Sequence, residues 1–129
     1  MKIDFNIDFK SRITGDISID SYEAVGEVGI KTAGRNIFLE DDFPILDIGI
    51  EISNWDERSR WVYSPEFMEV TPAISFVESG SQWMISGYNG ERSIVEIEDL
   101  RVFKSSFLDR LRIVSGYEIL NGSPKFRSL

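Results

Sequence analysis

The sequence contains neither cysteine nor histidine among its 129 residues. Without cysteine there is no disulfide, no thiolate metal ligand and no cysteine nucleophile, and the composition fits a reducing compartment. Without histidine, the Ser-His-Asp and Cys-His forms of nucleophilic catalysis are excluded. A bound metal would have to rely on oxygen ligands, which favours calcium, magnesium or manganese over zinc.

Long apolar runs are also missing. Asp4 and Asp8 interrupt the apolar residues at the start of the chain, so this stretch does not have the apolar core of a signal peptide. No later stretch has the uninterrupted apolar length of a membrane span. The phosphate-binding motifs GxxxxGK[ST] and GxGxxG are absent. We therefore expect a soluble cytoplasmic protein with no membrane association and no cofactor.

Positive charge is scarce, because 14 Lys and Arg residues stand against 22 Asp and Glu residues, for a formal net charge of −8. This balance argues against binding to nucleic acid, since contacts to the phosphate backbone depend on Lys and Arg. A charge of this size promotes solubility. It is equally suited to attracting a basic partner, or to competing for a surface that would otherwise take nucleic acid.

Alternating apolar and polar residues predict strands in the first third of the chain. Residues 3–9 alternate without a fault and residues 13–20 form a second alternating run, so residues 10–12 are expected to be the loop of a hairpin. Residues 25–32 continue as a third strand, in which two glycines weaken the strand or mark a bulge.

Residues 43–55 fit two periodicities at once. Alternation typical of a strand occurs at Leu46, Ile48, Ile50 and Ile52. Spacing typical of a helix occurs at Ile45, Ile48, Ile52 and Trp55. The preceding residues favour a helix, because Asp41 and Asp42 suit a helix N-terminus and Pro44 is tolerated in a first turn. We predict a helix here, although the β-branched residues count against it.

The stretch from Ile74 to Ile97 predicts three antiparallel strands joined by two tight turns. Asn89-Gly90 favours a two-residue type I′ turn, in which both central residues have positive φ, and Ser79-Gly80 is a weaker signal of the same kind. The resulting register places two cross-strand rows on the core side, with Glu96 at the sheet margin. These rows are Ile74, Ile85 and Ile94, and Phe76, Trp83 and Glu96.

The opposite face of this element is expected to be unusually apolar. It would carry Val77, Met84, Val95 and Ile97. Because a monomer rarely leaves such a patch open, we expect it to be covered within the chain, by a partner, or by a second copy in a homodimer.

A helix follows, with one apolar stripe at Leu100, Phe103, Phe107, Leu111 and Val114. Asp99 suits its N-cap and Gly116 its left-handed C-terminal residue. The order of elements predicts an α+β domain over residues 1–116, with a mostly antiparallel sheet of about 6–8 strands and two helices packed on one face. Residues 117–129 are expected to be a C-terminal tail or a short terminal strand.

Carboxylates are the most abundant groups able to carry acid–base chemistry. A pair of them supports glycoside hydrolysis without histidine, so a carboxylate-dependent hydrolase is one alternative function. Helix capping accounts for Asp41, Asp42 and Asp99 without any catalysis. Residues 40–42 also lack the ligand spacing of an EF-hand loop. We therefore assign no catalytic, cofactor-binding or metal-binding residue.

A partner-binding surface is the favoured hypothesis. It combines two acidic segments with two aromatic residues beside a charged loop, because aromatic residues are enriched at interface hot spots. Its residues are Glu40, Asp41, Asp42, Asp56, Glu57, Trp61 and Tyr63. Core packing is the alternative explanation for the two aromatic residues.

Four stretches resemble small bacterial domains of unknown function, some of which accompany polymorphic toxins as immunity proteins. They are FPILDIGIEISNW (43–55), WVYSPEF (61–67), ISFVESGSQWMISGY (74–88) and the helix around FLDRL (107–111). The resemblance implies an α+β domain that acts by binding and occludes a toxin active site with an acidic face. We therefore expect a non-enzymatic immunity protein that neutralises a basic toxin domain. The hydrolase and an oligomeric structural module are the alternatives.

Overall fold

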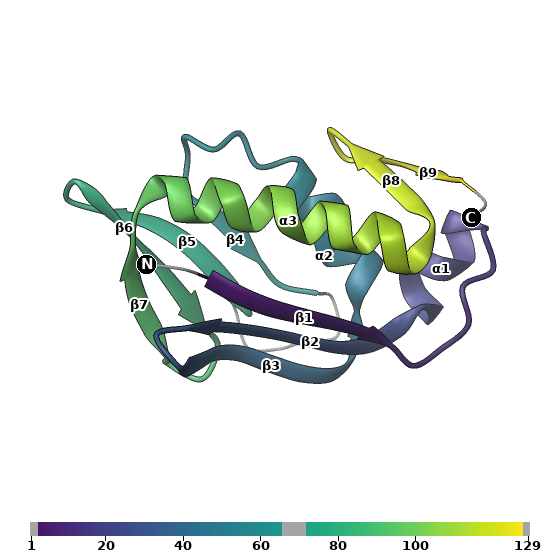
Figure 1. Ribbon diagram of the computed structural model, residues 1–129, viewed down its shortest axis with the longest axis horizontal. Coiled ribbons are helices and arrows are strands. Elements are labelled where there is room, and N and C mark those ends of the chain that lie inside the picture. The colour runs from purple at the N-terminus through teal and green to yellow at the C-terminus, as the bar shows by residue number, and fades with distance from the viewer. Residues whose placement is uncertain (1–2, 66–71, 128–129) are drawn as a thin grey trace.

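A computed structural model describes residues 3–65 and 72–127, and within them it contains nine strands and three helices (Figure 1). The strands are β1 (Ile3–Phe9), β2 (Val25–Thr32), β3 (Arg35–Pro44), β4 (Trp61–Tyr63), β5 (Ile74–Ser79), β6 (Gln82–Gly87), β7 (Arg92–Val95), β8 (Tyr117–Leu120) and β9 (Ser123–Phe126). The helices are α1 (Ile17–Glu23), α2 (Ile45–Ser53) and α3 (Ile97–Ser115).

Every strand pairing is antiparallel, so the predicted α+β class and antiparallel pairing are confirmed. The single sheet that we expected is instead divided into three. Their strand orders are β1-β2-β3, β4-β5-β6-β7 and β8-β9. The described part of the chain contains three helices where two were expected. None of the helices in the described residues is long and apolar enough to cross a membrane.

Helix α3 lies over the β1–β3 sheet, and the β8–β9 hairpin follows at its C-terminal end (Figure 1). The predicted apolar stripe is buried at Leu100, Phe103, Phe107 and Leu111. Phe103 packs against Phe5 of β1 and Phe76 of β5, with ring centroids 5.7 Å and 6.1 Å apart. One helix face therefore joins two sheets.

Both ends of α3 are capped by its own sequence. The N-cap is Glu96, and Asp99, which we expected at that position, stands three residues further on. The Asp99 carboxylate accepts a hydrogen bond of 2.9 Å from the Glu96 backbone N–H, which closes a capping box. At the other end Gly116 has φ 83°, as predicted, and its N–H donates to the Arg112 carbonyl at 2.9 Å.

The region after β1 corrects the prediction of a first hairpin. Residues 17–23 are helical, because the Asp16 side chain accepts a hydrogen bond of 3.0 Å from the Ser18 N–H and caps the helix. Strand β1 pairs instead with β2, from Ile3 opposite Thr32 to Phe9 opposite Gly26. The glycines do not mark a bulge in β2. The register with β3 shifts between Gly26 and Val28, but the extra residue there lies in β3, where two residues stand opposite one of β2.

Asp20 is the buried residue of α1, with 1% of its surface exposed. Its carboxylate accepts hydrogen bonds from the Thr14 N–H (2.9 Å) and hydroxyl (2.7 Å), and from the Gly15 N–H (2.9 Å). The Tyr117 hydroxyl donates a fourth, at 2.6 Å. Burial alone raises the pKa of Asp20, but these hydrogen bonds outweigh it and hold the pKa below its usual value.

The choice of helix for residues 43–55 is confirmed by α2. Its predicted apolar stripe is buried at Ile45, Ile48, Ile52 and Trp55. The helix begins later than expected, because Pro44 occupies the N-cap position and makes no side-chain capping bond. Asp41 and Asp42 therefore lie in β3 and do not cap the helix. A proline favours an extended residue before it, which extends the strand up to Pro44.

The loop between β5 and β6 differs slightly from the predicted one. Ser79 pairs with Gln82, so the two-residue loop is Gly80-Ser81, and Gly80 has φ 66°. The register moves by two residues, which leaves each side chain on its predicted face. Ile74, Phe76, Trp83 and Ile85 are accordingly buried.

The loop between β6 and β7 corrects the predicted type I′ turn. The Gly87 N–H donates to the Glu91 carbonyl at 2.8 Å, so the loop holds three residues, and of Asn89 and Gly90 only Gly90 has positive φ. A loop with three residues in place of two moves every side chain of β7 to the face opposite the predicted one. Val95 is therefore buried, and Ile94 is 39% exposed.

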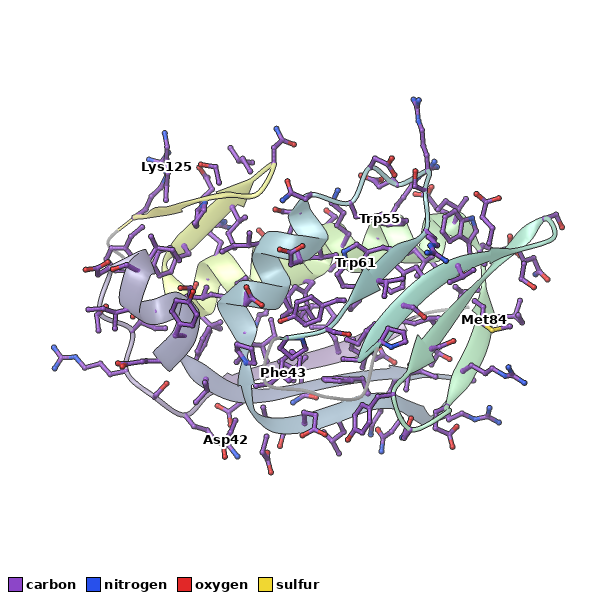
Figure 2. The ribbon with its side chains drawn as sticks, turned by 180° about the vertical axis from the view of Figure 1, so that it is seen from behind. Asp42, Phe43, Trp55, Trp61, Met84 and Lys125 are labelled. Atoms are coloured by element: carbon purple, nitrogen blue, oxygen red, sulfur yellow. The ribbon has the colours of Figure 1, made fainter. Side chains whose placement is uncertain are left out.

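The outward face of the β4–β7 sheet is consequently a different set from the predicted one. Met84 lies opposite Val77 on one side and Ile94 on the other. Val77 and Ile94 are each 39% exposed, and Figure 2 shows Met84 in this sheet, at the border of the molecule. Val95 belongs to the core, and Ile97 is the first residue of α3.

The stretch after Gly116 forms the β8–β9 hairpin, with Tyr117 and Ile119 in the core. Its loop is the type I′ turn that we had expected near residue 90, because Asn121 and Gly122 both have positive φ. Residues 66–71, for which the sequence indicates a connection and no regular element, lie outside the described residues.

Replacing Asp20 by Asn should lower the free energy of unfolding by about 2 kcal/mol at neutral pH, because the amide cannot accept from all four donors. The pKa of Asp20 is lower in the folded than in the unfolded chain, so its contribution is present above roughly pH 4 and is lost as pH falls through the folded-state pKa. Urea unfolding across this range should show the wild-type and Asp20→Asn stabilities converging in acid.

Tyr117→Phe is the matched control, because it removes only one of the four donors. It should cost about 1 kcal/mol and leave most of the acid dependence in place. A difference between wild type and Asp20→Asn that stayed constant down to acid pH would contradict the role assigned to the carboxylate.

Candidate partner-binding surface

The seven predicted binding residues do not form one patch. Glu40 accepts a short hydrogen bond from the Tyr88 hydroxyl, which raises the pKa of Tyr88. Asp41 pairs with Lys10 at 3.0 Å, and the hydrogen bond of this pair raises the pKa of Lys10. Both carboxylates thus serve contacts between β3 and neighbouring segments. Asp41 is nevertheless exposed, with 65% of its side chain accessible, whereas Glu40 is half-buried.

The acidic loop after α2 has its own local structure. The Asp56 carboxylate accepts from the N–H groups of Ser59 (2.8 Å) and Arg58 (2.9 Å), and these bonds lower the pKa of Asp56. Glu57 has φ 65° and forms an ion pair of 3.2 Å with Lys104 of α3. Asp56 therefore stabilises the loop, and Glu57 ties it to the helix.

Trp61 and Tyr63 are core residues, with 7% and 4% of their surfaces exposed. Their rings stack with centroids 6.0 Å apart, and Trp61 also packs on Phe76 at 4.7 Å. The Tyr63 hydroxyl donates to the Asp47 carboxylate at 2.7 Å, and burial together with this bond raises the pKa of Tyr63. Neither ring is available as an exposed anchor for a partner.

Sequence reasoning missed the polar side of α2. Asp47 and Glu51 lie one turn apart, opposite the buried isoleucines of the same helix, and Glu51 is exposed. Once the helix is chosen over the strand, the spacing of these two residues points to a shared outer face. Together with Asp42 and Asp56 they form what we call the α2 surface.

Two hollows flank α2 and hold these four carboxylates. The larger, of about 430 Å³, has Asp42 and Asp47 in its lining, beside Tyr22 and two prolines, Pro44 and Pro65. The smaller, of about 230 Å³, has Glu51 and Asp56 in its lining together with Arg60. Figure 2 shows α2 on the near side of the molecule, with Asp42 at the lower border. The α2 surface thus unites two of the predicted residues with two that were missed.

Tyr22 provides the exposed aromatic ring that we expected from Trp61 and Tyr63, since 75% of its surface is exposed. It comes from α1 and borders the larger hollow. Asp42, also in the lining of this hollow, has φ 51°, a left-handed conformation that Asp tolerates better than most residues. An aromatic ring, two carboxylates and a hollow therefore meet at one place.

Within the described residues no group of three or more Asp, Glu, Cys or His side chains is arranged to hold a metal ion. Searches of protein-family models, curated proteins and solved structures each gave no match to this chain. The function is therefore inferred from the shape and charge of the surface.

Replacing Tyr63 by Phe should lower the free energy of unfolding by about 1 kcal/mol, because the buried hydroxyl loses its bond to Asp47. The raised pKa of Tyr63 means that the folded chain keeps a proton which the unfolded chain releases, so this stabilisation fades as pH rises above roughly 10. Chemical unfolding on both sides of that pH measures the effect.

Tyr22→Phe is the exposed control and should change stability by less than about 0.5 kcal/mol. Equal effects of the two variants would contradict the assignment.

Proposed function

We propose that this protein is a non-enzymatic binding protein whose α2 surface engages a basic protein partner, in the manner of an immunity protein that neutralises a toxin domain. The observation that carries the proposal is the exposed Tyr22 ring beside the hollow lined by Asp42 and Asp47. Binding hot spots are typically aromatic residues next to a pocket, surrounded by polar groups.

The charge of the chain supports the same proposal. The net charge of −8 attracts a basic partner over a distance and raises its association rate. The hollows on the α2 surface add carboxylates where a Lys or Arg side chain of the partner can dock. Tyr22 then provides the apolar contact that charge alone does not supply.

The first experiment uses the immobilised protein to capture partners from the source organism, followed by binding measurements with each purified basic protein at low and high salt. A partner of this surface should bind less tightly as salt rises. If it is a toxin domain, its activity should be lost when this protein is added in excess. Failure to recover any basic partner, with candidate toxins remaining fully active, would refute the proposal.

Variants of Tyr22 and of the neighbouring α2 surface localise the contact. Tyr22→Ala should weaken binding about 30-fold, the effect of losing a hot-spot residue. The double variant Asp42→Asn, Glu51→Gln should slow association and reduce the salt dependence. The matched control Glu78→Gln, Asp109→Asn removes the same charge from β5 and α3. Equal losses in both double variants would mean that the partner responds to net charge and not to this surface.

A further inference from the structure

A second surface lies on the other side of the molecule, between β1 and α3. Strand β1 is an edge of its sheet, and among the described residues it pairs only with β2. Helix α3 runs beside it in the same direction (Figure 1). A groove of about 580 Å³ separates the two, with Ile3, Phe5, Val102 and Phe103 in its lining. A smaller hollow of about 240 Å³, reached by Ile7 and Arg110, continues it along β1.

The backbone of β1 directs hydrogen-bonding groups toward this groove. The Lys10 N–H donates to the Val25 carbonyl at 3.0 Å, so these opposed residues form a hydrogen-bonded pair. Such pairs alternate along an antiparallel ladder, which turns the N–H and C=O groups of Asp4, Asn6 and Asp8 toward β2. The N–H and C=O groups of the intervening residues, Ile3, Phe5 and Ile7, therefore point to the open edge.

The length of the groove suits a single added strand. Residues 3–7 of β1 extend over roughly 16 Å at the rise of a strand. Residues 98–110 of α3 extend over roughly 18 Å at the rise of a helix. A segment of about five or six residues would lie along both at once.

The two faces of β1 differ in character and determine the sequence of a matching strand. On the α3 side, Phe5 packs against Phe103 and Phe107, and the neighbouring Val102 is 56% exposed. On the other side, Asp4, Asn6 and Asp8 are exposed. Cross-strand neighbours of opposite charge stabilise a sheet, so an added strand fits best with apolar residues under α3 and basic residues beside the aspartates.

We infer that this groove accepts an extended segment of a protein partner as a fourth strand on β1, and that the segment alternates apolar and basic residues. Main-chain hydrogen bonds to an open edge supply affinity in this mode, and alternate side chains supply specificity. The described lining of the larger groove contains three carboxylates, Asp4, Glu98 and Asp99, and the smaller hollow adds Arg110. Glu98 pairs with Arg101 of the same helix at 3.6 Å, and Asp99 closes the capping box of α3. The site lies apart from the α2 surface and does not depend on it.

Charge also favours a basic segment over a second copy of the chain as the occupant of the groove. Two β1 strands paired edge to edge would bring the aspartates of both copies onto one face, where like charges destabilise the pairing. A basic strand has the opposite effect. The groove is therefore assigned to a different polypeptide, and self-pairing is an outcome against the inference.

The test uses a capped synthetic peptide of alternating lysine and valine, long enough to span β1. A control peptide has the same residues but carries methyl groups on alternate backbone nitrogens. The methyl groups remove the N–H donors that would face β1. Calorimetry should show the methylated peptide binding at least about tenfold more weakly. The amide protons of Phe5 and Ile7 should exchange more slowly in the complex with the unmodified peptide.

Val102→Arg should weaken binding of the peptide at least about tenfold, since it places a bulky cation in the groove. The matched control is Val77→Arg on the outward face of β5, which should leave binding unchanged. Both valines are exposed, so both variants are expected to fold, and circular dichroism checks this. The double variant Asp42→Asn, Glu51→Gln should also leave peptide binding intact, which keeps this test separate from that of the α2 surface.

Several outcomes would overturn the inference. Equal affinity for the two peptides would mean that charge alone attracts them. An undiminished affinity in Val102→Arg would place the peptide elsewhere. A dimer by light scattering that the peptide does not dissociate, with Phe5 and Ile7 protected before peptide is added, would assign the edge to a second copy.

Discussion

The fold depends on the apolar face of α3, because the sheets and α2 all pack against this one helix. Phe103 touches both the β1–β3 sheet and the β4–β7 sheet. Further along the helix, α2 approaches so closely that a Cβ built on Gly49 would lie 2.4 Å from the Leu111 side chain. None of the three sheets encloses a core of its own, because each supplies one wall around the same helix.

This arrangement leaves two separate acidic surfaces. The inner face of α3 is used by the core, so its flank borders the edge of β1 and forms a groove. Helix α2 packs on the other side, and its polar residues and the Tyr22 ring face solvent there. The groove is long enough for an extended chain, whereas the α2 surface is the one that we propose for a folded partner. One partner that contacted both would have to reach around the molecule.

Prediction from sequence succeeded where a stripe of apolar residues was long, as in α3 and α2. It failed where a local bond or the length of a loop decided the outcome. Ile17 and Ile19 alternate like a strand, yet the cap at Asp16 makes their segment a helix with a buried carboxylate. One additional loop residue before Gly90 turned β7 over. Only part of the α2 surface could be predicted from the sequence. Asp47 and Glu51 were missed, because they stand in a run that also fits a strand. Trp61 and Tyr63 were wrongly included, because the sequence does not indicate how deeply they are buried.

The bond between Asp20 and Tyr117 joins residues that are 97 positions apart. During synthesis the first helix leaves the ribosome long before the residue that completes its buried carboxylate site. Contacts of such sequence separation form late, since most of the chain has to be closed into a loop first. The amino-terminal part of this protein therefore reaches its final packing only when the last hairpin has emerged, and a chain stalled before residue 117 lacks one of the four hydrogen bonds to the Asp20 carboxylate.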